Sequence, residues 1–188
     1  MTAIVGLVHD GKVYIGGDSN VSYGWVQQRL AAPKVFVLPK AQMIVGVSGD
    51  VRIQQIFQYH ADIELPEGDA EQTLVQFFIP HFREVVKQHG YEKADNGQSS
   101  AGDIAALFGF RERLFRMDGN FAISGYQSSY AAVGSASETA IGALAALSLH
   151  TVGRFAPETL IRSVLEICEI HGLYVRPPFV IRNTGELS

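Results

Sequence analysis

The second residue of the chain, Thr2, offers the most specific chemistry in the sequence. A small second residue allows a methionine aminopeptidase to remove Met1, which would leave Thr2 with a free α-amino group. A threonine hydroxyl alone is a poor nucleophile, but an amine with a reference pKa of about 8 can take its proton. One residue would then supply both the nucleophile and the base of an acyl-transfer reaction. Threonine is also a common second residue before a strand, so its position is weak evidence by itself.

Two charged residues could assist Thr2. Asp18 follows the apolar run 12–17, and Lys34 begins the run 34–38. A hairpin of the first two runs would return Asp18 to the start of the first strand, and a neighbouring third strand of the same sheet would bring in Lys34. The lysine charge would lower the pKa of the threonine hydroxyl and amine, while Asp18 would keep the lysine charged. The alternative roles are a turn residue for Asp18 and an aggregation-blocking edge charge for Lys34.

Two strand-to-helix connections hold further candidate groups. Gly49 follows the run 42–48 and opens a helical segment, so its N–H could donate to a developing oxyanion, or it could be a helix-entry glycine. Ser135 and Glu138 match the Ser-x-x-Glu capping pattern before the segment 137–150. Capping is the simplest role for Ser135, and a hydroxyl at a reaction site is compatible with it.

Composition excludes several classes of function. The chain has 15 Lys and Arg against 19 Asp and Glu with no basic run, so nucleic acid is not an expected partner. Its 6 histidines show no paired metal spacing, and its single cysteine, Cys168, cannot complete a structural zinc site. No phosphate-binding glycine motif is present, so any ATPase would be a separate partner. We therefore expect neither a metal nor a cofactor.

The sequence also predicts where the protein works. The N-terminus shows no basic segment followed by an apolar stretch, and no window approaches the roughly 18 apolar residues that span a bilayer. A single cysteine suits a reducing compartment. We expect a cytoplasmic protein with no membrane partner.

The hydrophobic pattern predicts the elements that must position these residues. It indicates one domain, residues 1–188, in which strands, two helices, strands, two helices and a strand follow one another. Strands are expected at 3–8, 12–17, 34–38, 42–48, 104–110, 114–117, 121–124, 130–133 and 179–182, and helices at 51–59, 70–89, 137–150 and 157–170. The strands after residue 103 read as a meander in a second sheet. Residues 19–33 and 91–102 lack a strand pattern and are expected as loops, the first as a wall of the substrate site.

The helix at 70–89 has the clearest internal signals. Asp69 and Gln72 resemble a capping box at its start. Its apolar residues are expected to form one buried stripe, made of Leu74, Phe77, Phe78 and Phe82.

Taken together, several short motifs in a fixed order resemble a known family. They are Thr2-Ala-Ile-Val, Gly16-Gly-Asp18-Ser, Lys34-Val, Gly46-Val-Ser-Gly49 and Val133-Gly-Ser135. The combination resembles proteasome β-subunits and bacterial HslV, which are N-terminal nucleophile (Ntn) hydrolases. The resemblance covers most of the chain and is strongest at residues 2–50 and 130–150. It implies an α+β fold, a four-layer αββα sandwich with two antiparallel β-sheets flanked by helices.

The resemblance also implies roles for individual residues. Thr2 would be the nucleophile and amine base, and Val47 and Val51 would line the substrate pocket. The other implied catalytic residues are the supporting pair Asp18 and Lys34, the oxyanion donor Gly49 and the site hydroxyl of Ser135. One departure concerns the segment Cys168 to Gly172, where the family often has an aspartate followed by a serine and a glycine. Glu169 or His171 would have to substitute there.

The function that the resemblance implies is a threonine endopeptidase of a self-compartmentalised ring that cleaves unfolded polypeptide. It implies a homo-oligomer of stacked rings with about 12 or 14 subunits, with a separate ATP-dependent unfoldase as a further partner. Two alternatives stay open. The chain could be a non-catalytic scaffold subunit of such a ring, or an Ntn amidase that acts on a small amide.

Overall fold

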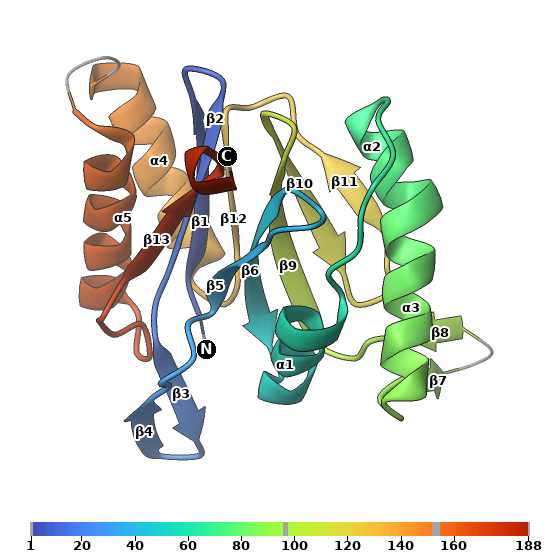
Figure 1. Cartoon of the computed structure of the whole chain (residues 1–188). Coiled ribbons are helices and arrows are strands. Elements are labelled where there is room, and N and C mark those ends of the chain that lie inside the picture. The colour runs from blue at the N-terminus through green and yellow to red at the C-terminus, as the bar shows by residue number, and fades with distance from the viewer. Residues whose placement is uncertain (1, 96–97, 152–154, 188) are drawn as a thin grey trace.

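Four layers make up the structure, a computed structural model that describes residues 2–95, 98–151 and 155–187. Two β-sheets pack face to face, and a pair of helical segments covers the outer face of each sheet (Figure 1). All neighbouring strands in both sheets are antiparallel. This is the α+β sandwich that the sequence predicted.

The four-stranded sheet carries the start of the chain. Its order is β12-β1-β2-β13, with β1 at Ile4–His9, β2 at Lys12–Gly17, β12 at Tyr130–Val133 and β13 at Val180–Asn183. Helices α4 (Ser137–Thr151) and α5 (Pro157–His171) cover it, and a short 3₁₀ helix η2 (Thr184–Leu187) follows the last strand. Buried side chains such as Val5, Ala140 and Leu165 fill the layer between this sheet and its helices.

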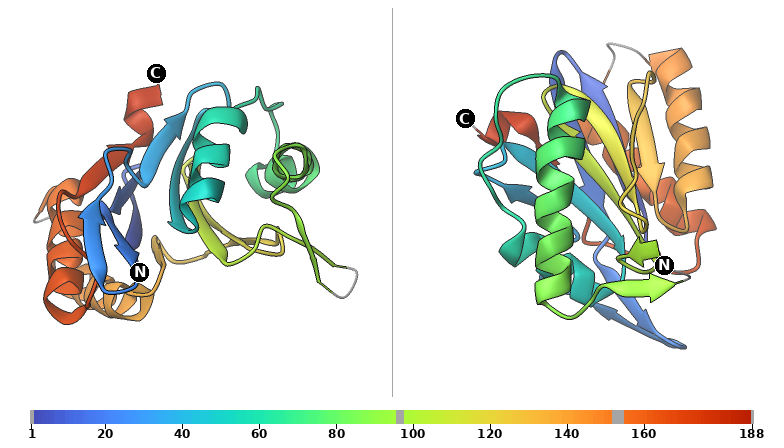
Figure 2. Two further views of the ribbon diagram at one scale, coloured as in Figure 1. Left: turned by 90° about the horizontal axis from the view of Figure 1, so that it is seen from below. Right: turned by 90° about the vertical axis from the view of Figure 1, so that its right-hand side faces the viewer.

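The five-stranded sheet has the order β11-β10-β9-β6-β5. Its strands are β5 (Val35–Leu38), β6 (Met43–Gly49), β9 (Ile104–Phe110), β10 (Arg113–Asp118) and β11 (Ile123–Gly125). Helix α1 (Val51–His60) and a longer helix over residues 70–88 cover its outer face, as the turned views in Figure 2 show. The prediction that the strands after residue 103 form a sheet of their own is therefore wrong. Strands β9, β10 and β11 extend the sheet of β5 and β6, and β12 pairs with β1.

Glycines let the two sheets approach closely. A Cβ atom on Gly46 of β6 would lie 2.4 Å from the Ile4 Cγ2 atom of the opposite sheet. A Cβ atom on Gly6 of β1 would lie 2.7 Å from side-chain atoms of Leu107 and Leu114. Branched side chains of one sheet thus occupy the space above glycines of the other, and no larger residue fits there.

The long helix contains one wide turn. It runs through α2 (Ala70–Thr73), a π-helical turn η1 (Leu74–Phe78) and α3 (Ile79–Gln88), where the Ile79 N–H donates to the Leu74 carbonyl. Pro80 lacks an N–H and its ring collides with the carbonyl four residues earlier, so a wider turn before it relieves the clash. At the helix start, the Gln72 N–H donates to the Asp69 carboxylate at 2.9 Å, while the Gln72 side chain bonds Gln76 instead of closing the capping box.

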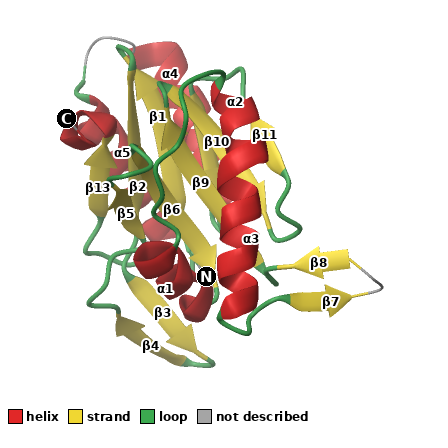
Figure 3. Ribbon diagram, turned by 45° about the vertical axis from the view of Figure 1, so that its right-hand side comes forward, coloured by secondary structure: helices red, strands yellow, loops and turns green. Residues whose placement is uncertain are grey.

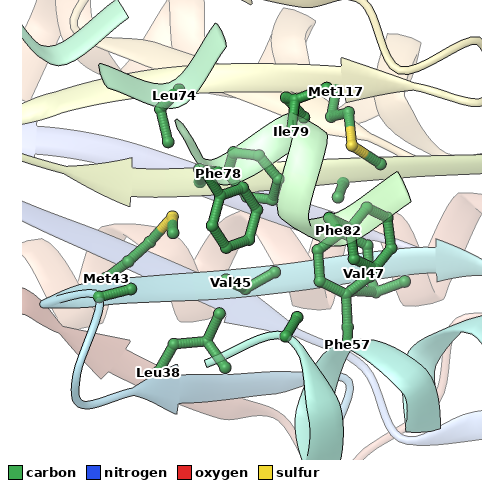
Figure 4. Packing of buried hydrophobic residues seen from close by; sticks show 14 of the residues in the cluster. Leu38, Met43, Val45, Val47, Phe57, Leu74, Phe78, Ile79, Phe82 and Met117 are labelled. Carbon is green, nitrogen blue, oxygen red and sulfur yellow. The ribbon is translucent and has the colours of Figure 1, made fainter. Parts of the chain in front are cut away.

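An aromatic cluster joins this helix to α1 and the sheet. Phe57 and Phe82 stack with ring centroids 3.8 Å apart (Figure 4). Phe78 packs edge-on to Phe108 of β9. Leu74, Phe78 and Phe82 are fully buried, but Phe77 is 48% exposed, so its predicted place in the buried stripe is wrong. The three buried residues are spaced by four, and the wide turn rotates Phe77 further from that row.

The prediction that residues 19–33 and 91–102 are loops is wrong, because each segment contains a pair of antiparallel strands. Residues 19–33 contain β3 (Asn20–Tyr23) and β4 (Val26–Arg29), and residues 91–102 contain β7 (Lys93–Asp95) and β8 (Gln98–Ser100). Both extend from the body of the molecule (Figure 3). All four residues of β4 are exposed, so no burial pattern marked it as a strand in the sequence. The other predicted strands and helices agree with the structure within two residues at each end.

Across the described ranges, no helix combines the length and the apolar character needed to cross a membrane.

The aromatic cluster gives a stability prediction. Phe82→Ala should lower the free energy of unfolding by about 3–5 kcal/mol, because it leaves a cavity under a fully buried ring. Phe77→Ala, on the same helix, should change it by less than about 1 kcal/mol. Chemical denaturation of the two variants and the parent chain measures both values. Equal losses would show that Phe77 belongs to the core after all.

Candidate active site

The Lys34 ammonium joins the hydroxyl of Thr2 to the carboxylate of Asp18. Its Nζ atom lies 2.9 Å from Thr2 Oγ1 and 3.1 and 3.0 Å from the two carboxylate oxygens of Asp18. The exposed fractions of Thr2, Asp18 and Lys34 are 5%, 1% and 5%. The structure thus brings together the three residues that the sequence singled out.

Strand pairing brings Asp18 to Thr2. Ile4 of β1 is opposite Gly17 of β2. The residues just beyond these strand ends, Ala3 and Asp18, therefore also lie opposite each other. The Asp18 N–H donates to the Ala3 carbonyl at 3.3 Å, and the Ala3 N–H donates to the Asp18 carboxylate at 3.0 Å. The hairpin of β1 and β2 therefore returns Asp18 to the start of β1, as the sequence predicted.

Lys34 arrives from the other sheet. It immediately precedes β5, and its carbonyl accepts a hydrogen bond from the Val47 N–H of β6 at 2.9 Å. The expectation that a third strand of the same sheet would supply Lys34 is therefore wrong. The side chain instead crosses the space between the two sheets, which the close approach at Gly46 allows.

The hydrogen bonds of this group are complete. A lysine ammonium has three N–H donors, and three oxygen atoms of Thr2 and Asp18 receive them. The N–H of Asn20 also donates to the Asp18 carboxylate at 2.9 Å. Because Lys34 can only donate, the Thr2 oxygen accepts from it and keeps its own hydrogen for another acceptor.

Burial and charge act on Lys34 in opposite directions. Desolvation lowers the pKa of its ammonium below the ordinary 10.5, and the charge and hydrogen bonds of Asp18 oppose that effect. Asp18 is therefore the group that favours a charged lysine beside the Thr2 hydroxyl. This direction of effect is the one the sequence analysis proposed for the pair.

The main chain of Thr2 is fixed by the turn after β12. The Thr2 nitrogen donates to Ser135 Oγ at 3.1 Å, and the Ala136 N–H donates to the Thr2 carbonyl at 3.3 Å. Gly134 has φ +99, and a Cβ atom there would lie 2.3 Å from the Thr2 carbonyl oxygen, so only glycine fits. Helix α4 begins at Ser137, which places Ser135 before the cap position. Its hydroxyl therefore contacts the Thr2 nitrogen and does not cap α4 as the Ser-x-x-Glu pattern suggested.

Gly49 lies where β6 ends. Its φ is +125, and a Cβ atom would lie 2.3 Å from the Asp103 carbonyl oxygen, so close backbone approach requires glycine here. The cap of α1 is the next residue, Asp50, whose carboxylate accepts from the Arg52 N–H at 2.7 Å. Gly49 thus borders the site one residue before the helix cap.

Two cavities meet at Thr2 and Gly49. The larger cavity, of about 500 Å³, is otherwise lined by residues that include Ser48, Asp103, Arg116, Asp118 and Ser135. The smaller pocket, of about 90 Å³, is otherwise lined by residues that include Val21, Leu30, Lys34, Val47, Val51 and Gln54. Val47 and Val51 therefore lie in a pocket beside Thr2, as the family resemblance implied. Residues of β3 and Leu30 line the same pocket, so the segment 19–33 forms part of its wall.

The segment Cys168 to Gly172 does not place its polar side chains at the site. Glu169 and His171 line neither cavity, and His171 is exposed at the end of α5. Cys168 is the residue of this segment that faces inward, with its sulfur 3.9 Å from the Ala136 carbonyl oxygen. Burial and the nearby Asp18 charge raise the pKa of its thiol to about 11, so it stays protonated near neutral pH.

Three further buried polar residues support the site; Asn20 and Gln54 were not predicted, and Ser19 was noted only as part of the motif Gly16-Gly-Asp18-Ser. Ser19 and Asn20 tie the Asp18 turn to the loop after α5, through bonds to the carbonyls of Pro178 at 2.7 Å and Tyr174 at 2.8 Å. Gln54 of α1 donates to the Pro33 carbonyl at 3.0 Å, next to Lys34. A glutamine between Ile53 and Phe57 on a buried helix face was a usable signal for Gln54, whereas no pattern marked Asn20.

No group of three or more potential metal ligands occurs within the residues that the structure describes.

Comparison with known proteins supports the fold. No protein-family model and no curated protein matches the chain. Solved structures do match over nearly its whole length. Thiobacillus denitrificans BPH has a TM-score of 0.79 and 18% identity, with 96% of each chain covered. The same protein in complex with epoxomicin has a TM-score of 0.78 and 17% identity, over 96% of this chain and 97% of that one.

Two further structures extend the match. Eukaryotic HslV from Trypanosoma brucei has a TM-score of 0.65 and 14% identity, over 96% of this chain and 98% of that one. The Anbu (Gly-1) mutant from Hyphomicrobium sp. strain MC1 has a TM-score of 0.67 and 10% identity, over 98% and 82%. The chain therefore has the Ntn hydrolase fold, as the sequence resemblance predicted.

The buried ion pair of Lys34 and Asp18 can be tested by stability measurements, without an activity assay. Lys34→Met should lower the free energy of unfolding by about 3–5 kcal/mol, because it leaves the Asp18 carboxylate buried without its cation. Adding Asp18→Asn to that variant should restore part of the loss. Denaturation of the parent, both single variants and the double variant gives the coupling free energy. Additive losses would mean that the two charges do not interact as the geometry indicates.

Proposed function

We propose that the chain, after removal of Met1, is an N-terminal threonine peptidase. The observation that carries the proposal is the 2.9 Å contact between Lys34 Nζ and Thr2 Oγ1, combined with the separate contact of the Thr2 nitrogen with Ser135. The hydroxyl has a cation beside it, and the nitrogen, once it is an amine, lies within the same residue as a base. The Ntn hydrolase fold supports this assignment.

Acylation uses both groups of Thr2. The neutral α-amine takes the hydroxyl proton as Oγ1 attacks the carbonyl carbon of a peptide bond, which forms a tetrahedral oxyanion. The Lys34 ammonium stabilises the charge that develops on Oγ1, and the N–H of Gly49 is the proposed donor to the oxyanion. When the C–N bond breaks, the amine returns the proton to the leaving nitrogen, and the acyl group stays on Oγ1 as an ester.

Deacylation repeats these steps with water. The amine takes one proton from water, the hydroxide oxygen adds to the ester carbonyl, and the C–O bond to Thr2 breaks. The proton then returns to Oγ1, so the enzyme is regenerated. Ser135 accepts a hydrogen bond from the Thr2 nitrogen and would hold the amine in place through both half-reactions.

We further propose that copies of the chain form a cytoplasmic homo-oligomeric ring that encloses the sites and admits unfolded polypeptide. The likeness in fold to HslV and Anbu supports ring formation. Unfolding of a folded substrate would require a separate ATP-dependent partner, because the chain lacks a phosphate-binding glycine motif.

Covalent labelling tests the nucleophile. Epoxomicin is the test compound because Thiobacillus denitrificans BPH has been solved in complex with it. Intact mass should show the chain without Met1 and with one added epoxomicin, and Thr2→Ala should take up none. Cys168→Ser should label like the parent, since the buried thiol is not the target. Label retained by Thr2→Ala would reject the mechanism.

The same samples separate the two alternatives. A scaffold subunit would keep Met1 or remain unlabelled while still forming rings. An amidase for small amides would label at Thr2 but behave as a monomer or dimer in size-exclusion chromatography with light scattering.

The pH dependence of turnover should report Lys34. Its charged form is present below its pKa and is lost as the pH rises, so kcat/KM should fall on an alkaline limb below pH 10.5. Asp18→Asn should move this limb to lower pH, because Asp18 raises the lysine pKa. Lys34→Ala should lower turnover by about 100-fold or more, while Lys87→Ala, at an exposed lysine of α3, should not change it. If the alkaline limb of kcat/KM stays at the same pH in Asp18→Asn, the group that titrates there is not Lys34.

A further inference from the structure

The two reactive groups of Thr2 contact residues of different cavities. Lys34, which touches the Thr2 hydroxyl, lines the smaller pocket and not the larger cavity. Ser135, which touches the Thr2 nitrogen, lines the larger cavity and not the smaller pocket. The larger cavity is therefore on the nitrogen side of Thr2.

The path of the proton relates this asymmetry to the substrate. In the proposed reaction the leaving nitrogen receives its proton from the Thr2 amine, so it must lie on the side of that amine. The part of the polypeptide that follows the scissile bond then extends into the larger cavity. Its volume of about 500 Å³ is within the roughly 300–1,000 Å³ range of ligand pockets.

The residues that line the larger cavity carry more negative than positive charge. The Arg116 guanidinium forms an ion pair with Asp118, with Nε and Nη2 at 2.8 and 2.7 Å from the same carboxylate oxygen, and it also bonds the Tyr126 side chain. Among the described residues, no cation forms an ion pair with Asp103, and its electrostatic neighbour is Tyr91, a phenol whose pKa is raised to about 12. Two carboxylates and one guanidinium leave the cavity with one negative charge in excess.

We propose that the larger cavity binds the residue that follows the scissile bond and, through Asp103 and the Asp118–Arg116 pair, selects a basic side chain there over an acidic one. This inference rests on the proposed function. The same excess charge suits the product, because the new amino terminus of the leaving peptide becomes an ammonium when the C–N bond breaks. Asp103 is exposed, and the side chains of Arg116 and Asp118 are 37% and 42% exposed, so solvent weakens the selection.

The first test measures turnover of three peptides that differ only in having arginine, glutamine or glutamate after the scissile bond. In the parent, kcat/KM should be about 3- to 10-fold higher for arginine than for glutamate, and the ratio should shrink as salt is added. Asp103→Asn should abolish the ratio, and Asp103→Asn with Asp118→Asn should reverse it, because only the guanidinium charge remains. Glu166→Gln, at an exposed carboxylate of α5, is the matched control and should keep the parent ratio.

The second test does not need catalysis. Short peptides that begin with arginine or glutamate are titrated by NMR into the Thr2→Ala variant, with and without Asp103→Asn. Tighter binding of the arginine peptide that is lost in Asp103→Asn is the expected result. Equal affinities, or a preference that survives Asp103→Asn, would overturn the inference. Failure of the glutamine peptide to be cleaved would count against the proposed peptidase function instead, and the binding ratio would still decide the charge selection.

Discussion

The site depends on a charge buried between two sheets. An ammonium removed from water costs several kcal/mol unless its donors are satisfied, and the Lys34 ammonium is satisfied by one carboxylate and one hydroxyl. The carboxylate is held in turn by the main-chain N–H groups of Ala3 and Asn20. Thr2 thus receives a hydrogen bond from a cation whose position is fixed by both sheets at once.

The rest of the sandwich makes this arrangement rigid. Glycines at the sheet interface bring the backbones close enough for a lysine that precedes β5 to reach a threonine that precedes β1. On the outer face, the aromatic cluster around Phe57 and Phe82 joins α1 and α3, and α1 follows directly from the Gly49 turn. The dense packing of these layers leaves the side chains of the site few alternative positions.

Local patterns in the sequence were enough for most elements and for the choice of Thr2, Asp18 and Lys34, since strand ends and turns are read from neighbouring residues. Local patterns did not predict which sheet supplies Lys34, because they do not indicate which strands share a sheet. The β3–β4 hairpin was missed because its second strand is wholly exposed. Glu169 and His171 were chosen by their type, and the structure shows that Cys168 is the inward residue at that turn of α5. Asn20 was missed because its role depends on a carbonyl 154 residues later.

The contact between Thr2 and Ser135 also has a consequence for biosynthesis. The two residues are 133 positions apart, so the ribosome must complete most of the chain before the environment of Thr2 can close. Until then the bond between Met1 and Thr2, whose cleavage is part of the proposed function, would be accessible to an aminopeptidase that acts on nascent chains. Once β1 has paired with β12, Thr2 is only 5% exposed, and an initiator residue still attached would hold its nitrogen as an amide. The long separation between Thr2 and Ser135 would therefore leave time for the proposed removal of Met1 before folding encloses Thr2.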